Sequence, residues 1–219
     1  SSSSSYPSRS ILSLHSYLYR FKCLYDRWRS SLMTPILGIM ASQISGHLTP
    51  PSSFESIATV TAAGGETSLS FTSIPADYKS LQIRGIAKSA STSDNTTGLN
   101  LRFNSDTASN YWYHVLRGSG STVDAFGVGT TSISIYGGAI GNTTSNLFGA
   151  FILDVIDYAS TTKYKTTRAF AGNDSNGAGT NHVALDSGLW SSTSAINSIQ
   201  INAVISHVAG TTFALYGVK

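Results

Sequence analysis

The sequence predicts an all-β protein, an antiparallel two-sheet sandwich of the jelly-roll kind preceded by an N-terminal arm. Three observations support this prediction. Apolar and polar residues alternate over many short stretches after residue 53, clusters of Gly, Asn and Ser separate those stretches, and no stretch of this region has helical periodicity. Many short strands joined by such turns, without intervening helices, are typical of β-sandwiches.

Three stretches show the alternation most clearly. They are GLNLRFN (98–104), INSIQINAVI (196–205) and TTFALYGV (211–218). Alternate side chains of a strand point to opposite faces, so each stretch has one apolar face that we expect to be buried. Further strands are predicted near residues 55–63, 67–73, 79–88, 110–117, 131–137, 147–158 and 163–171, about ten in all. The predicted inward residues are Leu99, Leu101 and Phe103; Ile199, Ile201, Ala203 and Ile205; and Phe213, Leu215 and Gly217.

Two predicted strands are apolar on both faces. LFGAFILDVIDY (147–158) is almost continuously apolar, and NYWYHVLR (110–117) contains four consecutive rings. A sandwich strand ordinarily buries one face, so we expect the other face to be covered by a sister subunit or by a bound sugar. The outward pair of rings is either Tyr111 with Tyr113 or Trp112 with His114. The candidate residues for an interface or a glycan site are Tyr111, Trp112, Tyr113, His114 and Trp190.

The segment TPPSS (49–53) divides an arm from a domain at 54–219, because four of the five prolines lie at or before Pro51 and eighteen of the twenty glycines lie after it. Within the arm, residues 1–32 form a Ser/Arg-rich leader. Its apolar residues are spaced alternately by three and four positions, which predicts an amphipathic helix or a short coiled coil. A sequence read upstream of a natural start at Met33 is the alternative interpretation. The predicted helical seam is Ile11, Leu14, Leu18, Phe21, Tyr25, Trp28 and Leu32.

The second part of the arm, residues 33–53, contains a short uncharged apolar stretch. A bilayer span needs about 20 apolar residues, and this stretch has about ten, so we expect no membrane span. A short apolar tail ahead of a Pro-Pro hinge is suited to docking in a groove of a partner. The candidate docking residues are Ile36, Leu37, Ile39 and Met40.

Charge and cysteine content exclude several classes of protein. Residues 1–32 have five basic residues against one acidic residue, whereas the remainder has a formal charge of −1. The β domain is therefore not expected to bind nucleic acid. Cys23 is the only cysteine, which excludes an intrachain disulfide and a cysteine-built zinc site.

Motifs for catalysis or cofactor binding are missing from the sequence. No phosphate-binding loop, dinucleotide fingerprint or hydrolase elbow is present, and the five histidines lack metal-ligand spacing. Asp154 and Asp157 lie three positions apart and therefore on opposite faces, and Asp154 is expected to pair with Lys165 or Arg168. DSNGAGT from Asp174 resembles half of a calcium loop, although a plain hairpin loop is the preferred interpretation. We expect no enzyme activity, no cofactor and no metal.

Residues 54–219 resemble a family of small virion structural proteins of tailed bacteriophages. The stretches that carry the resemblance are FESIATVT (54–61), FTSIPADYKSLQIRGIA (71–87), LRFNSDTASNYWYHVLRGSGS (101–121), LDVIDYASTTKYKTTRAFAG (153–172), SGLWSSTSAINSIQI (187–201) and FALYGV (213–218). The resemblance implies a virion component with a β-sandwich body and a short N-terminal tail, which decorates the capsid or forms a head or tail fibre.

Three functional hypotheses follow from these observations. The first is a homo-oligomeric virion protein, expected to be a trimer, whose arm docks onto another virion protein such as the major capsid or tail protein. The second is a carbohydrate-binding module for host-surface glycans, since rings stack on sugar faces. The third, a polysaccharide depolymerase, has no acid/base pair in the sequence to support it.

Overall fold

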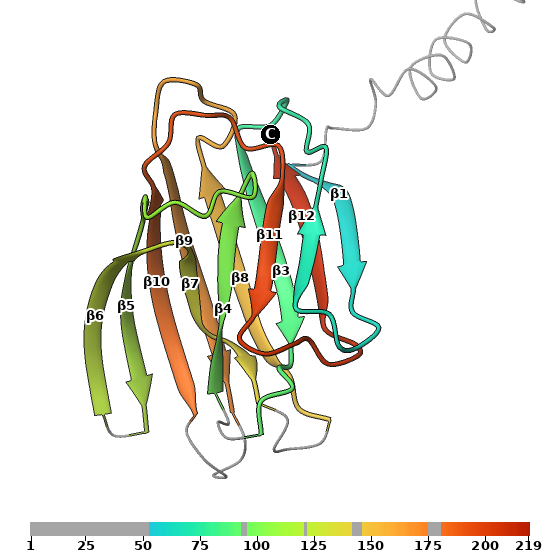
Figure 1. Cartoon of the computed structure of the whole chain (residues 1–219), viewed down its shortest axis with the longest axis vertical. Coiled ribbons are helices and arrows are strands. Elements are labelled where there is room, and N and C mark those ends of the chain that lie inside the picture. Colours follow the sequence, from blue (N-terminus) through green and yellow to red (C-terminus); the bar gives the residue numbers. More distant parts are fainter. Residues whose placement is uncertain (1–52, 93–95, 121, 142–145, 175–180) are drawn as a thin grey trace, which may run out of the picture. The chain divides into compact units, whose positions relative to one another are not determined.

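The computed structural model describes residues 53–219 apart from 93–95, 121, 142–145 and 175–180 (Figure 1). These residues belong to the second of the chain's two units, Ser52–Lys219. The predicted helical seam and docking arm lie outside the described residues, and so does most of the stretch that follows Asp174.

The described part of the chain contains twelve strands and no helix, which confirms the prediction of an all-β, two-sheet antiparallel protein. In chain order the strands are β1 (Phe54–Thr61), β2 (Ser68–Phe71), β3 (Ser80–Ala87), β4 (Thr96–Phe103), β5 (Tyr111–Ser119), β6 (Thr122–Thr130), β7 (Ile133–Ile140), β8 (Gly149–Ile156), β9 (Lys165–Asn173), β10 (His182–Trp190), β11 (Ile199–Ala203) and β12 (Thr212–Val218).

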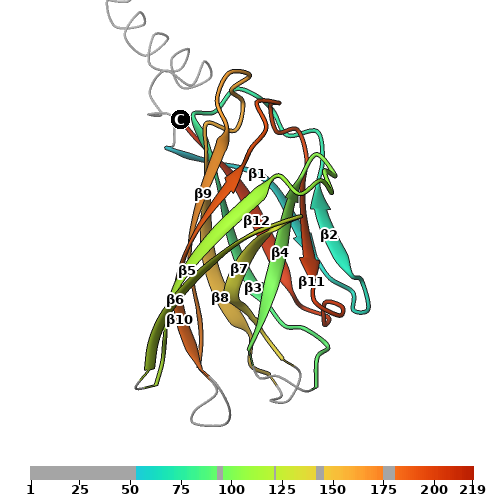
Figure 2. The same ribbon diagram turned by 60° about the vertical axis from the view of Figure 1, so that its left-hand side comes forward.

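The two sheets differ in size. The larger has eight strands in the order β1-β12-β3-β8-β9-β10-β5-β6, and the smaller has four in the order β2-β11-β4-β7. Figure 1 shows β6 and β1 at opposite margins of the molecule, and Figure 2 shows β4, β11 and β2 in a layer of their own. The larger sheet therefore continues past the smaller one, through β5 and β6.

The core lies between the sheets. Leu99, Leu101 and Phe103 of β4 belong to the same core cluster as Phe213 and Leu215 of β12, and all five side chains are fully buried. Alternation in the sequence predicted these inward faces, and the structure confirms them. Ile199, Ile201 and Ala203 are inward as predicted, but Ile205 is 53% exposed because β11 ends at Ala203.

Two strands, β6 and β10, were missing from the sequence-based prediction. The β6 sequence TVDAFGVGT has glycines at two alternate positions and exposed side chains along most of its length, so it lacks the apolar alternation that identifies a strand. The β10 sequence HVALDSGLW alternates, but its Val183 and Leu185 face away from the core. Burial of a large apolar face is what produces the sequence signal. β6 buries neither face, and the face that β10 buries carries Ala184, Asp186 and Gly188 in its middle.

In the middle of β9 and β10, small side chains face the core and larger apolar ones face outward. Ala169 and Ala171 of β9 are buried, whereas Phe170 between them is 55% exposed. In β10, a side chain on Gly188 would lie 2.6 Å from a carbon of Ile133 in β7. The small inward residues therefore let β7 approach closely, and Phe170, Val183 and Leu185 lie on the outer face of the eight-stranded sheet.

Candidate functional site

The four rings of the NYWYH stretch alternate about β5. Tyr111 is fully buried and Tyr113 is half-buried on the inner face, whereas Trp112 and His114 lie exposed on the outer face. The outward pair is therefore Trp112 with His114. Of the two alternatives that the sequence left open, the structure selects this one.

Tyr111 and Trp190 belong to the core rather than to a surface site. Their rings stack with centroids 6.2 Å apart, and Phe103 packs against Trp190 with a centroid separation of 5.5 Å. The indole Nε1 of Trp190 donates a 2.8 Å hydrogen bond to Asp106. Burial alone would raise the pKa of Asp106, but hydrogen bonds from Asn110, the Ala108 amide and Trp190 outweigh it and lower that pKa. These contacts give Trp190 a structural role.

The outward rings of β5 cover glycines of the neighbouring strand β6. Trp112 is directly opposite Gly129, and His114 is opposite Gly127. A Cβ built on Gly129 would lie 2.9 Å from two indole carbons, and one on Gly127 would lie 2.3 Å from an imidazole carbon. The rings therefore occupy the space of the missing side chains, as aromatic residues do when they shield glycines in a sheet. Trp112 remains 52% exposed.

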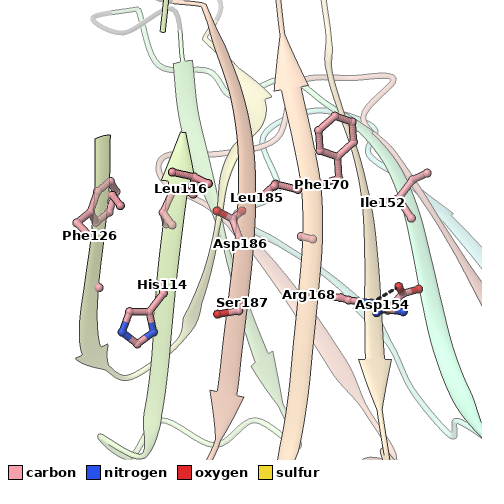
Figure 3. A pocket seen from close by; sticks show the side chains of 14 residues that line it. His114, Leu116, Phe126, Ile152, Asp154, Arg168, Phe170, Leu185, Asp186 and Ser187 are labelled. Carbon is pink, nitrogen blue, oxygen red and sulfur yellow. Dashed lines mark hydrogen bonds and ion pairs between the residues drawn. The ribbon is translucent and has the colours of Figure 1, made fainter. Parts of the chain in front are cut away.

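A row of large apolar side chains crosses the outer face of the eight-stranded sheet. Leu116 of β5 is opposite Leu185 of β10, Leu185 is opposite Phe170 of β9, and Phe170 is opposite Ile152 of β8. Figure 3 shows these four side chains at one level on four adjacent strands. Each is about half exposed. We call Leu116, Leu185, Phe170 and Ile152, together with Val183 in the next row, the apolar band.

The band is hollowed rather than flat. A depression of about 830 Å³ lies over its main row, and its lining includes Leu116, Phe170, Leu185 and Ile152. A second depression of about 330 Å³ lies beside Val183, where Gly172 has no side chain. Apolar surface that lies in depressions offers a partner more contact area than an evenly convex surface does.

A polar row borders the band on one side. His114, Ser187, Arg168 and Asp154 occupy the next level of the same four strands. Asp154 accepts from Arg168 Nε at 3.0 Å and from Gln82 Nε2 at 2.9 Å. The predicted pairing of Asp154 with Arg168 is therefore confirmed. Lys165, the alternative partner, is buried and donates to the carbonyls of Lys163 and Ser192 at 2.7 and 3.3 Å.

Behind the band, on the inner face, lies a cluster of polar groups around Asp186. Its carboxylate is 5% exposed and accepts a 2.8 Å hydrogen bond from the Tyr136 amide through Oδ2, while Oδ1 has no hydrogen-bond partner among the described residues. Burial raises the pKa of Asp186 to about 7. Nearby, the Arg117 guanidinium donates to Asp124 at 2.7 and 2.9 Å and contacts Tyr136. These bonds connect β5 and β6 to each other and to β7.

Within the described ranges, no three His, Cys, Asp or Glu side chains are close enough to hold a metal ion. The same residues include no helix long and apolar enough to span a membrane. The prominent chemical feature is the outer face itself, an apolar band with a polar border and one exposed indole.

Part of this surface could be found from the sequence and part could not. The strands at 110–117 and 147–158 were identified as apolar on both faces, and they contribute Leu116 and Ile152. Sequence reasoning missed Phe170, Val183 and Leu185. Their signal was the alternation of Ala with a larger apolar residue in β9 and β10, which is ordinarily interpreted with the larger residue inward. Comparisons with protein-family models, curated proteins and solved structures found no significant match.

Proposed function

We propose that this chain is a non-enzymatic structural protein of a bacteriophage virion that associates with copies of itself through the apolar band. The observation that carries the proposal is the continuity of the band across four adjacent strands. Single exposed apolar residues are common on protein surfaces, but a contiguous patch of this kind marks an interaction site. Burying Leu185 and Phe170 against a sister subunit would remove their exposed apolar surface from water.

The virion part of the proposal is supported by the resemblance of residues 54–219 to small structural proteins of tailed bacteriophages. On this proposal the chain decorates the capsid or forms part of a head or tail fibre. Residues 33–53 then tether it to the particle, through a protein such as the major capsid or tail protein. A trimer is the expected oligomer.

The proposed architecture is a jelly roll with two inserted hairpins. What supports it is the nesting of the strand pairs. β1 pairs with β12, β2 with β11, β3 with β8 and β4 with β7, so the chain runs out along four strands and returns beside them. The hairpins β5–β6 and β9–β10 interrupt this path, and both extend the larger sheet. They supply most of the apolar band, so the insertions carry the proposed interface.

Self-association is tested by light scattering of the full chain behind a sizing column. Leu185→Ser is the informative variant, and Ile205→Ser is its matched control, because both side chains are 53% exposed but Ile205 lies outside the band. We expect an oligomer for the unmodified chain and for Ile205→Ser, and a lower mass for Leu185→Ser. A monomer at every concentration, or an equal effect of the two substitutions, would contradict the proposal.

The virion location has a separate test. Particles of the phage that encodes this sequence are purified by density gradient and digested for mass spectrometry. We expect peptides from residues 54–219 in a constant ratio to the major capsid protein. Finding the chain only in the lysate supernatant would contradict a virion role while leaving self-association open.

A second candidate function is adhesion to host-surface glycans, favoured by Trp112. A depression of about 440 Å³ beside the indole is lined by His114, Thr166 and Ser187 among others, which combines a ring with hydroxyl groups as sugar sites do. A glycan array probed with the full chain tests it, with Trp112→Ala as the variant and the exposed Tyr164→Ala as the control. Binding lost only in Trp112→Ala supports adhesion, and an array without signal contradicts it.

A further inference from the structure

The edge strand β6 differs from the three other edges of the two sheets. An open edge exposes unpaired amide and carbonyl groups to any added strand, and most proteins block it with bulges, charges, prolines or short strands. β2 has only four residues, β1 has a register shift between Ser56 and Ala58, and β7 is largely buried. β6 pairs with β5 over nine residues without a register shift, and among the described strands it has no second partner.

The sequence of β6 also lacks the usual blocking residues. TVDAFGVGT contains no Lys, Arg or Pro. Its one charge, Asp124, is held by two hydrogen bonds from Arg117. Val123 is 73% exposed, and Phe126 and Val128 are also exposed. The strand is therefore long, regularly paired, rich in exposed apolar residues and open at its outer edge, and these properties favour strand addition.

We propose that β6 pairs in an antiparallel manner with β6 of a second copy of this chain, which joins the two larger sheets into one. The register that pairs all nine residues is centred on Phe126, so Phe126 lies opposite Phe126 of the second copy. The arrangement is a closed two-fold contact that adds no further copies at this edge.

The side chains favour a second copy over an unrelated strand. In this register Val123 of the second copy lies opposite Gly129, which is the residue that the Trp112 ring covers. The exposed valine therefore packs beside the exposed indole, and the contact occurs twice by symmetry. On the inner face the Phe126 rings form a cross-strand aromatic pair.

Charge is compatible with the same register. Asp124 lies opposite Val128 of the second copy, and the two Asp124 side chains are four positions apart along the strands, about 14 Å. That separation exceeds the Debye length of about 8 Å at physiological ionic strength, so their repulsion is largely screened. No like charges face each other across the pair, because β6 has no other charged residue.

Disulfide trapping tests the register in the full chain with Cys23→Ser. Phe126→Cys places two thiols opposite each other at the two-fold axis, within bridging distance. Val128→Cys is the matched control, because it lies on the same face but its two copies are about 14 Å apart. We expect a covalent dimer under mild oxidation for Phe126→Cys alone. Equal trapping of both variants, or none of Phe126→Cys, would overturn the proposal.

A second variant keeps the test independent of changes at Phe126. Val123→Lys places a charge beside Trp112 of the second copy, whereas Val204→Lys adds the same charge at another exposed valine away from β6. The edge pair doubles whatever assembly the apolar band forms, so we expect the mass in light scattering to fall by half for Val123→Lys alone. An unchanged mass for Val123→Lys would overturn the pairing. Leu185→Ser tests the apolar band separately, because Leu185 does not belong to β6.

Discussion

The indole of Trp112 in β5 fills the space above Gly129, the residue directly opposite it in β6. His114 has the same relation to Gly127. The two rings thus replace the side chains that alternate positions of the edge strand lack. This arrangement accounts for part of what covers the outward rings of NYWYH. One side of the Trp112 ring lies over a glycine, while half of the side chain remains exposed for a partner.

Adding a side chain at Gly129 is expected to displace the Trp112 ring. In Gly129→Ala the new Cβ would meet two indole carbons at 2.9 Å, so the ring must rotate away from β6. We expect a loss of about 1 kcal/mol in the free energy of unfolding and a red-shifted Trp emission. Gly118→Ala is the control, because no atom lies within 4 Å of its Cβ position. Urea unfolding followed by fluorescence measures both variants. Equal free energies of unfolding and equal emission maxima would show that the position of the Trp112 ring does not depend on Gly129.

The Tyr158 hydroxyl is expected to stabilise the loop after β2. It donates a 2.6 Å hydrogen bond to the Pro75 carbonyl and accepts one of 3.2 Å from the Tyr78 amide. Tyr158→Phe leaves both groups without this partner, at an expected cost of about 1 to 3 kcal/mol. Tyr164→Phe, at an exposed tyrosine, should change stability by only a few tenths of a kcal/mol. Thermal melting measures both variants. Equal shifts in melting temperature for Tyr158→Phe and Tyr164→Phe would contradict this role.

The buried carboxyl of Asp186 is expected to make stability depend on pH. Its pKa is raised to about 7 in the folded protein from an ordinary value of 3.8. The folded state therefore binds more protons than the unfolded state between about pH 4 and 7. The contribution of the Asp186 carboxyl to stability is thus largest below pH 4 and declines as the pH rises to 7. Asp186→Asn removes this decline. As the pH rises from 4 to 8, we expect the free energy of unfolding of the variant to increase relative to that of the unmodified chain by on the order of 4 kcal/mol.

Asp124→Asn provides the contrasting case for the same measurement. The hydrogen bond from Arg117 lowers the pKa of Asp124, so its contribution to stability is present above pH 4 and is lost as pH falls through the lowered pKa. Between pH 5 and 8 the difference between Asp124→Asn and the unmodified chain should be constant. Urea unfolding at pH 5, 6, 7 and 8 measures both variants. A pH-independent difference for Asp186→Asn would show that Asp186 titrates normally.

The alternation of apolar residues predicted most of the fold. Leu99, Leu101 and Phe103 were assigned to the core because a strand with one buried face repeats every second residue, and the structure places them there. β6 escaped prediction because neither of its faces is buried. Ile205 was assigned inward because the alternation continues past the end of β11, where the backbone leaves the sheet.

The candidate site was predicted only in part, for a related reason. The sequence identified β5 and β8 as apolar on both faces, and their outer faces carry Leu116 and Ile152, each about half exposed. It could not indicate that Phe170 and Leu185 join them, because alternation specifies two faces of a strand without specifying which one is inside. The larger apolar residues are ordinarily inside, and close approach by β7 reverses this at Phe170 and Leu185.

Local sequence therefore specified the all-β class, most of the strands and the inward residues of the core, because backbone alternation and burial act within a single strand. Tertiary structure alone decided the strand order and the outward rings of β5. It also decided the assembly of the apolar band from four strands and the open edge at β6. These features depend on which strands become neighbours. Residues 103 and 199, or 116 and 185, are brought side by side only when the chain folds.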